Sequence, residues 1–237
     1  MNLLLLEQDD FTSANRVQIT GRRLQHMREV HQVVEGQTLK AGLINGDMGA
    51  GTITSVSPSA VEMELELTTP PPAPLPLTLV LALPRPKMMR RVLQTIATMG
   101  VKQVYLINSY RVEKSYWQSP FLSPDAIREQ LILGLEQGCD TALPEVHLHK
   151  RFKPFVEDDL PAIVGDSTAL VAHPKGNNPC PINIQQPTTL AIGPEGGFIP
   201  YEVEKLEEAG FQAVTLGARI LRVETAIPTL LSRLYPL

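Results

Sequence analysis

Cysteine, long apolar runs and positive charge are all scarce in this chain of 237 residues, and each scarcity excludes a class of protein. The two cysteines, Cys139 and Cys180, provide neither a disulfide framework nor a set of metal ligands. No apolar run reaches the roughly 18 residues that a membrane-spanning helix needs. We therefore expect neither a metal site nor a membrane partner.

The start of the chain also lacks the marks of a targeting segment. It reads MNLLLLEQDD, with no basic residues before the leucines and no small-residue cleavage site after them. This pattern favours a buried first strand over a signal peptide. The low cysteine count fits a reducing cytoplasm, where we expect the protein to be located.

An excess of positive charge, which would indicate a nucleic-acid partner, is missing, because the net charge is −4. Binding to phosphate depends on a local patch rather than on the total charge, and basic residues do gather in three places. These clusters are Arg22, Arg23 and Arg28; Lys87, Arg90 and Arg91; and Lys150, Arg151 and Lys153. Each cluster is either a contact surface for nucleic acid or an ordinary solvated surface, and the sequence leaves both interpretations open.

What the chain does have is a globular composition, with 43% apolar and 19% charged residues, and one proline-rich stretch. Residues 69–76 read TPPPAPLP, which excludes a helix or a central strand and favours a stiff, extended spacer. We place a domain boundary there. Residues 1–69 form the first predicted domain, residues 70–77 the linker and residues 78–237 the second domain.

The first predicted domain has the pattern of a small β-barrel. Asn45-Gly46 is a strong turn signal between two strand-like segments, residues 37–44 and 51–56. Residues 60–67 (AVEMELEL) then alternate apolar and acidic side chains, which is the period of a half-buried strand.

The second predicted domain alternates strands and helices. Periodic apolar residues predict helices at residues 87–100, 123–138 and 201–210, each of which ends at a glycine. Short apolar segments predict strands at residues 79–83, 104–107, 146–148, 169–172, 190–192 and 213–216. Such alternation predicts a mostly parallel sheet with helices on both faces. Ligands of such sheets bind beyond the carboxyl ends of the strands.

A glycine-rich loop directly follows the strand predicted at residues 190–192. Ile192–Phe198 (IGPEGGF) allows the backbone to approach a ligand closely, because its glycines lack side chains. The loop has neither the Lys-Ser/Thr pair of a phosphate-binding loop nor the spacing of a dinucleotide fingerprint. Glu195 disfavours phosphate and favours a ligand with positive charge or hydroxyl groups, such as S-adenosylmethionine.

A second motif, Leu216–Ala226 (LGARILRVETA), follows the next predicted strand. Its apolar residues Ile220, Leu221 and Val223 provide a slot for a flat base. Arg222 and Glu224 either pair with one another or contact the substrate. An isolated pair of this kind is usually a surface ion pair of little energetic value.

Taken together, the two motifs closely resemble the signatures of the bacterial 16S rRNA uracil-N3 methyltransferases, a family of the SPOUT superfamily. Ala172-His173-Pro174 also resembles the first cofactor-facing turn of that family. The resemblance implies an α/β methyltransferase domain with a trefoil knot, preceded by a small PUA-like β-barrel. It further implies S-adenosylmethionine as cofactor, a homodimer, and 16S rRNA or the small ribosomal subunit as partner.

The resemblance also implies roles for individual residues. Arg222 is the first candidate for stabilising a uracil anion, with a purely structural role in bracing the knot as the alternative. Arg219 is the second candidate, and Glu224 is an orienting group. The expected cofactor-binding residues are Val171, Ala172, His173, Gly193, Pro194, Glu195, Gly196, Gly197, Leu216, Gly217, Ile220, Leu221, Thr225 and Ala226. The expected RNA-binding residues are Arg22, Arg23, Arg28 and Lys87.

Several positions differ from the family's pattern. Thr95 and Thr98 replace a lysine and a glutamate, and Asp140 replaces an arginine. Ile199 replaces the usual Ser/Thr before a helix, at a cost of about 1 kcal/mol. These differences keep two alternatives open: a catalytically silent knotted protein that binds RNA or assists ribosome assembly, and a methyltransferase for another RNA.

Overall fold

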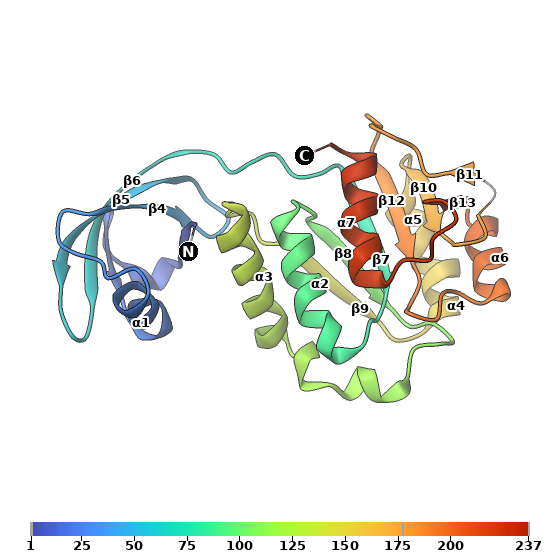
Figure 1. Cartoon of the computed structure of the whole chain (residues 1–237), viewed down its shortest axis with the longest axis horizontal. Coiled ribbons are helices and arrows are strands. Elements are labelled where there is room, and N and C mark those ends of the chain that lie inside the picture. Colours follow the sequence, from blue (N-terminus) through green and yellow to red (C-terminus); the bar gives the residue numbers. More distant parts are fainter. Residues whose placement is uncertain (1, 177, 237) are drawn as a thin grey trace. The chain divides into compact units, whose positions relative to one another are not determined.

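The computed structural model describes residues 2–176 and 178–236. The chain divides into two compact units. The first unit consists of Met1–Ala73 and Leu135–Leu143, and the second of Pro74–Gly134 and Pro144–Leu237. The two units are drawn in Figure 1, where the colour runs from blue to red along the chain.

The first unit is built on a six-stranded sheet in the order β1-β4-β5-β6-β3-β2. Its strands are β1 (Leu4–Leu6), β2 (Phe11–Ser13), β3 (Arg16–Ile19), β4 (Thr38–Leu43), β5 (Met48–Val56) and β6 (Val61–Thr69), and its helix is α1 (Gly21–Glu29). β1 pairs with β4 in parallel, and the other described pairs are antiparallel.

Local sequence signals account for much of this sheet. Asn45 and Gly46 form the turn between β4 and β5, with Asn45 at a φ of 59°. In β6, Val61, Met63 and Leu65 are buried and the glutamates between them are exposed, as the alternation predicts. The leucines at the start of the chain form the buried strand β1, which confirms the expected first strand.

The second unit contains a seven-stranded sheet in the order β11-β13-β10-β12-β7-β8-β9, and every described pairing in it is parallel. The strands are β7 (Leu77–Ala82), β8 (Gln103–Ile107), β9 (Glu145–His149), β10 (Thr168–Ala172), β11 (Asn178–Pro179), β12 (Thr188–Ile192) and β13 (Gln212–Thr215). Six of these strands lie where the short apolar segments predict them, and β11 is the one strand of this described sheet without such a signal.

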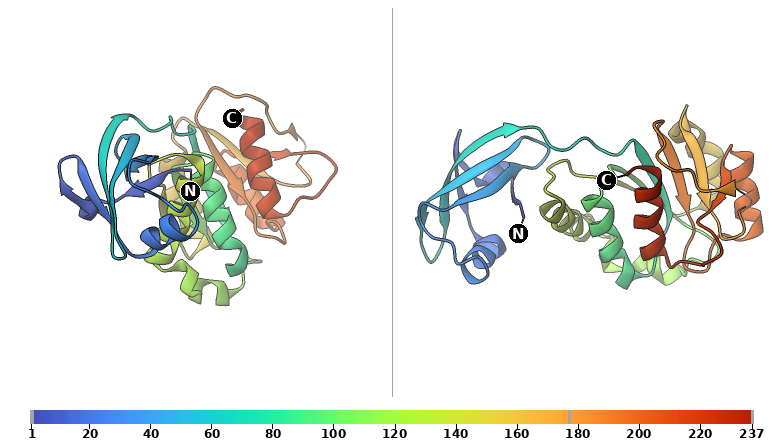
Figure 2. Two further views of the ribbon diagram at one scale, coloured as in Figure 1. Left: turned by 60° about the vertical axis from the view of Figure 1, so that its left-hand side comes forward. Right: turned by 45° about the horizontal axis from the view of Figure 1, so that its top comes forward.

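Helices cover both faces of this sheet (Figure 1). They are α2 (Pro86–Thr98), α3 (Pro124–Gly138), α4 (Phe152–Pro154), α5 (Leu160–Val164), α6 (Pro200–Glu208) and α7 (Val223–Leu234). α2 and α7 pack side by side over one face, as both views of Figure 2 show. On the other face α5 contacts β12 and α6 contacts β13. The second unit is therefore an α/β fold with helices on both sides of a parallel sheet, as predicted.

The end of α7 is tied to the sheet by Tyr235, which is buried. Its hydroxyl oxygen lies 2.8 Å from Thr188 Oγ1 and 2.8 Å from the carbonyl oxygen of Gln186. The carbonyl oxygen of Pro76, just before β7, is 3.1 Å away. One side chain thus connects the last helix to the beginnings of two neighbouring strands. Across the described part of the chain, no helix has the length and apolar character needed to cross a membrane.

Candidate functional site

Three loops meet at the carboxyl ends of β13, β10 and β12, which are neighbours in the parallel sheet. Together with the first turns of α7, these loops enclose a cavity of about 320 Å³. Its lining consists of Ala172, His173, Pro174, Ile192, Gly193, Pro194, Glu195, Gly196, Gly197, Val214, Thr215, Leu216, Arg219, Ile220, Leu221, Val223, Ala226 and Leu230. The cavity occupies the edge at which parallel sheets bind ligands.

The structure brings most of the expected cofactor-binding residues together. Those that line the cavity are Ala172, His173, Gly193, Pro194, Glu195, Gly196, Gly197, Leu216, Ile220, Leu221 and Ala226. Three others lie outside it: Val171 is buried within β10, while Gly217 and Thr225 are exposed. The lining also includes Val214, Thr215 and Leu230, which no sequence motif indicated.

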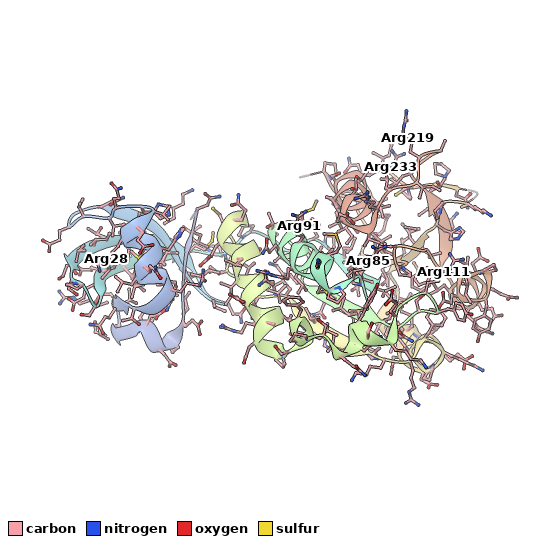
Figure 3. The ribbon with its side chains drawn as sticks, turned by 60° about the horizontal axis from the view of Figure 1, so that its bottom comes forward. Arg28, Arg85, Arg91, Arg111, Arg219 and Arg233 are labelled. Atoms are coloured by element: carbon pink, nitrogen blue, oxygen red, sulfur yellow. The ribbon has the colours of Figure 1, made fainter. Side chains whose placement is uncertain are left out.

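The expected catalytic residues occupy different positions. Arg219 lines the cavity, and Figure 3 shows it at the surface of the second unit. Arg222 is exposed at the N-cap of α7, and Glu224 is half-buried in the first turn of that helix. Neither of these two lines the cavity, and within the described residues no salt bridge joins them.

Two arginines from other strands hold the glycine-rich loop. Arg85 follows β7; its backbone N–H donates to Glu195 Oε1 at 3.1 Å, and its guanidinium Nε lies 3.6 Å from the same oxygen. Arg111 follows β8, and its Nη1 donates to the carbonyl oxygen of Gly196. The two arginines therefore grip consecutive residues of the loop; both are labelled in Figure 3, at some distance from Arg219.

Neither arginine was among the site residues expected from the sequence. Neither belongs to the two motifs, although Arg85 lies just before the basic cluster that begins at Lys87. Their place after the carboxyl end of a predicted strand was the available clue, because such positions converge at the ligand-binding edge of a parallel sheet. At Gly196 a Cβ atom would lie 2.7 Å from Arg111 Cδ, so a larger residue there would require the Arg111 side chain to shift.

A buried carboxylate joins the start of α6, just after the glycine-rich loop, to the turn after β8. Glu202, in the first turn of α6, is 2% exposed. It accepts hydrogen bonds from the Ser109 hydroxyl (3.1 Å), the Tyr110 N–H (2.7 Å) and the Ile199 N–H (3.0 Å). The bond to Ile199 caps the start of α6 from within the helix. It offsets part of the loss that isoleucine at the capping position implies.

His173 is held in the cavity wall by two hydrogen bonds, and the pKa of its imidazole is lowered. Burial, and then the positive charge of Lys175, lowers the pKa of His173, while Glu207 acts in the opposite direction. Its Nδ1 accepts a hydrogen bond from the Lys175 N–H at 3.2 Å, and its own backbone N–H donates to Val214 at 2.9 Å. Both bonds hold the ring beside the end of β13.

The cavity suits a small ligand with one flat apolar part and one cationic part. Its volume lies within the range of about 300–1,000 Å³ that is usual for small-molecule sites. Ile220, Leu221 and Val214 supply apolar surface, and Glu195 supplies negative charge. Nowhere in the described residues do three or more His, Cys, Asp or Glu side chains gather as metal ligands would.

The expected RNA-binding residues differ in whether their side chains already make hydrogen bonds or ion pairs within the protein. Arg22 and Lys87 are exposed. Arg28 is also exposed and donates to the carbonyl oxygen of Pro58 at 3.1 Å. Arg23, by contrast, binds both carboxylate oxygens of Asp10, at 2.6 and 2.7 Å, and thereby braces the first unit.

A parallel α/β domain with a cavity at the carboxyl ends of its strands is typical of proteins that bind small molecules. Comparison with known proteins identifies the family. The family model described as RNA methyltransferase domain matches residues 71–235, and the chain belongs to this family. The ribosomal RNA small subunit methyltransferase E of Treponema pallidum is 31% identical over 236 residues, with 95% of this chain and 87% of that protein covered. The ribosomal RNA small subunit methyltransferase E 1 of Borreliella burgdorferi is 22% identical over 95% of this chain and 94% of its own.

Solved structures share the fold over nearly the whole chain. The ribosomal RNA small subunit methyltransferase E of Neisseria gonorrhoeae, bound to S-adenosylmethionine, superposes with a TM-score of 0.74 at 24% identity, covering 97% of this chain and 96% of that one. A methyltransferase of Legionella pneumophila in complex with S-adenosylmethionine also gives a TM-score of 0.74, at 23% identity, covering 98% of this chain and 95% of that one.

Proposed function

We propose that this protein transfers a methyl group from S-adenosylmethionine to the RNA of the small ribosomal subunit, at N3 of a uridine. The observation that carries the proposal is the cavity at the ends of β10, β12 and β13, because both sequence motifs contribute to its wall. The names of the relatives support the rRNA substrate, and the two ligand-bound neighbours support the cofactor.

The lining residues fit S-adenosylmethionine by their chemistry. The cofactor carries a sulfonium and an amino group, and Glu195 is the acid among the cavity-lining residues. The adenine ring is flat and largely apolar, which suits Ile220, Leu221 and Val214. Backbone groups of the glycine-rich loop are accessible to the ribose and the amino-acid part. Val171, Gly217 and Thr225 would support these loops from outside the cavity.

Methylation at N3 has three requirements: an accessible base edge, loss of the N3 proton and in-line transfer of the methyl group. The Watson–Crick edge must be free, so the target is an unpaired or splayed-out base. The N3 proton must leave to solvent water, and S-adenosylmethionine, when bound, would supply the methyl group in line and leave as S-adenosylhomocysteine. We assign Arg222 first, and Arg219 second, to stabilise the negative charge on uracil, with Glu224 as an orienting group. No cysteine lines the cavity, so the proposed mechanism has no covalent adduct with the base.

The same proposal includes the trefoil knot, the PUA-like character of the first unit, a homodimer and a cytoplasmic location. The homodimer has support in the cavity itself. Ile220 lines the cavity and yet is 82% exposed, so one subunit leaves an apolar side of the site open to water. A second copy of the chain would cover it. Arg22, Arg28 and Lys87 are the proposed RNA contacts outside the cavity.

Two of the positions that differ from the family's pattern make hydrogen bonds within this structure. Thr98 Oγ1 donates to the carbonyl oxygen of Gly134 in α3, at 2.9 Å. Asp140 is 4% exposed and accepts a hydrogen bond from the Ala142 N–H at 2.8 Å. Thr98 and Asp140 are thus engaged within the protein, and the activity measurement below decides between the enzyme and the catalytically silent alternative.

The test has two steps. Isothermal titration calorimetry of the wild-type protein with S-adenosylmethionine should show binding, and Gly193→Val should abolish it, because a Cβ there would lie 2.8 Å from Phe198 N. Transfer of labelled methyl groups should then be measured on small ribosomal subunits from a strain that lacks the gene. Primer extension should stop at one uridine, since N3-methylation blocks base pairing.

Each outcome has a defined meaning. Absence of cofactor binding would overturn the enzyme proposal, and binding without transfer to any RNA would favour the silent alternative. For the residue roles, Arg222→Ala should lower kcat by about 10²–10³-fold and leave the Kd for S-adenosylmethionine within about twofold. An equal loss in Arg219→Ala alone would move the role to Arg219.

A further inference from the structure

Tyr110 combines an exposed ring with a firmly held backbone. The side chain is 79% exposed, in the turn that follows β8. Its N–H donates to the buried carboxylate of Glu202, and the preceding Ser109 donates its hydroxyl to the same group. The Val112 N–H closes the turn on the carbonyl oxygen of Ser109 at 3.0 Å. The ring is therefore presented to solvent from a rigid base.

In the sequence, Tyr110 directly precedes a residue that contacts the cavity wall. Arg111, the following residue, donates to the carbonyl oxygen of Gly196, which lines the cavity. Tyr201 precedes Glu202 in α6 and is 43% exposed, so two tyrosines flank the same buried carboxylate. A single exposed aromatic residue is ordinary on a protein surface. Tyr110 is fixed through its backbone and directly precedes an arginine that contacts the cavity wall, and this combination has the features of a binding surface.

Unpaired nucleobases bind to aromatic rings by stacking. Each stacked base contributes about 1–3 kcal/mol, with little dependence on sequence. Because the backbone of Tyr110 is already held, only the rotamers of its side chain have to be ordered when a base binds. Arg111 adds positive charge beside it, and its guanidinium carries five N–H donors, more than the bond to Gly196 uses. RNA matches both features, because its bases stack on aromatic rings and its phosphates attract a guanidinium.

We propose that Tyr110 is a base-stacking residue for the RNA substrate, holding an unpaired base beside the glycine-rich loop. This inference rests on the proposed function, since it deepens the account of the same site. Glu202 acts through Tyr110 and Arg111 as a positioning residue, because it fixes the turn that presents the ring.

The test measures RNA binding rather than catalysis. The probe is a short, end-labelled single-stranded oligouridylate, and its Kd is determined by fluorescence anisotropy at low ionic strength, where phosphate contacts are strongest. Tyr110→Ala should weaken binding by about 5- to 150-fold, which corresponds to the loss of one stacked base. Tyr110→Phe keeps the ring and should bind within about twofold of the wild type.

A matched control is Ile182→Ala, which removes another apolar side chain of the second unit, 66% exposed. It should leave the Kd unchanged. A probe in which one base is 2-aminopurine adds a direct readout, because stacking quenches its fluorescence. Quenching should appear with the wild type and with Tyr110→Phe, and should be lost with Tyr110→Ala. Thermal unfolding of each variant verifies that the fold is retained.

Three results would overturn the inference: no binding of the oligouridylate by the wild type, equal binding by Tyr110→Ala, or equal losses in Tyr110→Ala and Tyr110→Phe. The last would assign the role to the hydroxyl instead of the ring. Failure of the proposed function has a different signature. It appears as absence of cofactor binding and methyl transfer by the wild type, and the anisotropy experiment requires neither.

Discussion

At the scale of single residues, the segments around the cavity are held in place by side chains that do not line it. Glu202 is the clearest example, because its carboxylate accepts hydrogen bonds from Ser109, Tyr110 and Ile199 while almost fully buried. These three donors belong to two segments, the turn after β8 and the start of α6. One side chain therefore connects the turn after β8 to the start of α6, which directly follows the glycine-rich loop.

Replacement of Glu202 by alanine should lower the free energy of unfolding by about 1–3 kcal/mol, since it leaves buried donors without an acceptor. Glu202→Gln retains one carbonyl oxygen and should cost less. Urea unfolding followed by circular dichroism measures both effects. The control is Glu204→Gln on the exposed side of the same helix, which should change stability by no more than about 0.5 kcal/mol. Equal stability of Glu202→Ala and the wild type would contradict this account of the cavity's support.

His173 predicts a pH dependence with a definite sign. Its pKa in the folded protein lies below the ordinary value of 6.5, because burial and Lys175 disfavour the charged ring. Between the two pKa values the unfolded chain binds more protons than the folded one, so stability rises with pH in that window. The contribution is complete above about pH 6.5 and is lost as the pH falls through the folded pKa.

The measurement is a series of urea unfolding curves on both sides of pH 6.5, for the wild type and for His173→Gln. The wild type should lose more stability than the variant on the acid side, and the two curves should run parallel on the alkaline side. Titration of the ring protons of His173 by NMR gives the folded pKa directly. A pKa above 6.5, or parallel curves throughout, would contradict the prediction.

At the scale of elements, the packing of α2 against α3 depends on the absence of a side chain at Gly134. A Cβ atom there would lie 2.4 Å from the carbonyl oxygen of Gln94 and 2.7 Å from Ala97 Cβ. Because the two helices lie so close at Gly134, Thr98 Oγ1 can donate a hydrogen bond to the Gly134 carbonyl oxygen at 2.9 Å. Gln94 also donates to Gln130 at 2.7 Å. The two helices are thus held by polar bonds across a narrow contact.

Gly134→Ala should therefore destabilise the protein by about 1–2 kcal/mol, because the cost of overpacking exceeds the gain in helix propensity of about 1 kcal/mol. Gln137→Ala, at an exposed position of the same helix, removes side-chain volume without entering a contact and serves as the control. Chemical unfolding compares the two. If Gly134→Ala proved more stable than the wild type, propensity would outweigh packing and the helices would have to separate easily.

At the scale of the whole molecule, the chain contains two units, each with its own core. Met63 lies in the core of the first unit and Leu190 in that of the second, and both are fully buried. Met63→Ala and Leu190→Ala should each cost about 2–5 kcal/mol in the unit concerned. In differential scanning calorimetry each variant should lower the midpoint of one transition and leave the other in place. Equal shifts of a single transition would show that the two units unfold together.

Local signals explain which parts of the fold were predictable. The strands of the parallel sheet are short apolar segments, and Ser123 caps α3 by accepting a hydrogen bond from the Ala126 N–H at 3.3 Å. The turn at Asn45 follows from the tolerance of asparagine for positive φ. β11 and the helical segment from Phe152 to Val164 escaped prediction, because β11 has only two residues and the helical segment contains prolines and no regular apolar stripe.

The sequence by itself determined the alternation of strands and helices, the two motifs, and the resemblance that carries the cofactor and substrate expectations. These depend on residue type and on spacing along the chain, which are local properties. Only the tertiary structure decided which side chains reach the cavity. It placed Arg85 and Arg111 on consecutive residues of the glycine-rich loop, and it placed Arg222 outside the lining. The reason is physical: neighbours in a parallel sheet are far apart in sequence, so the side chains that meet at its edge share no local pattern.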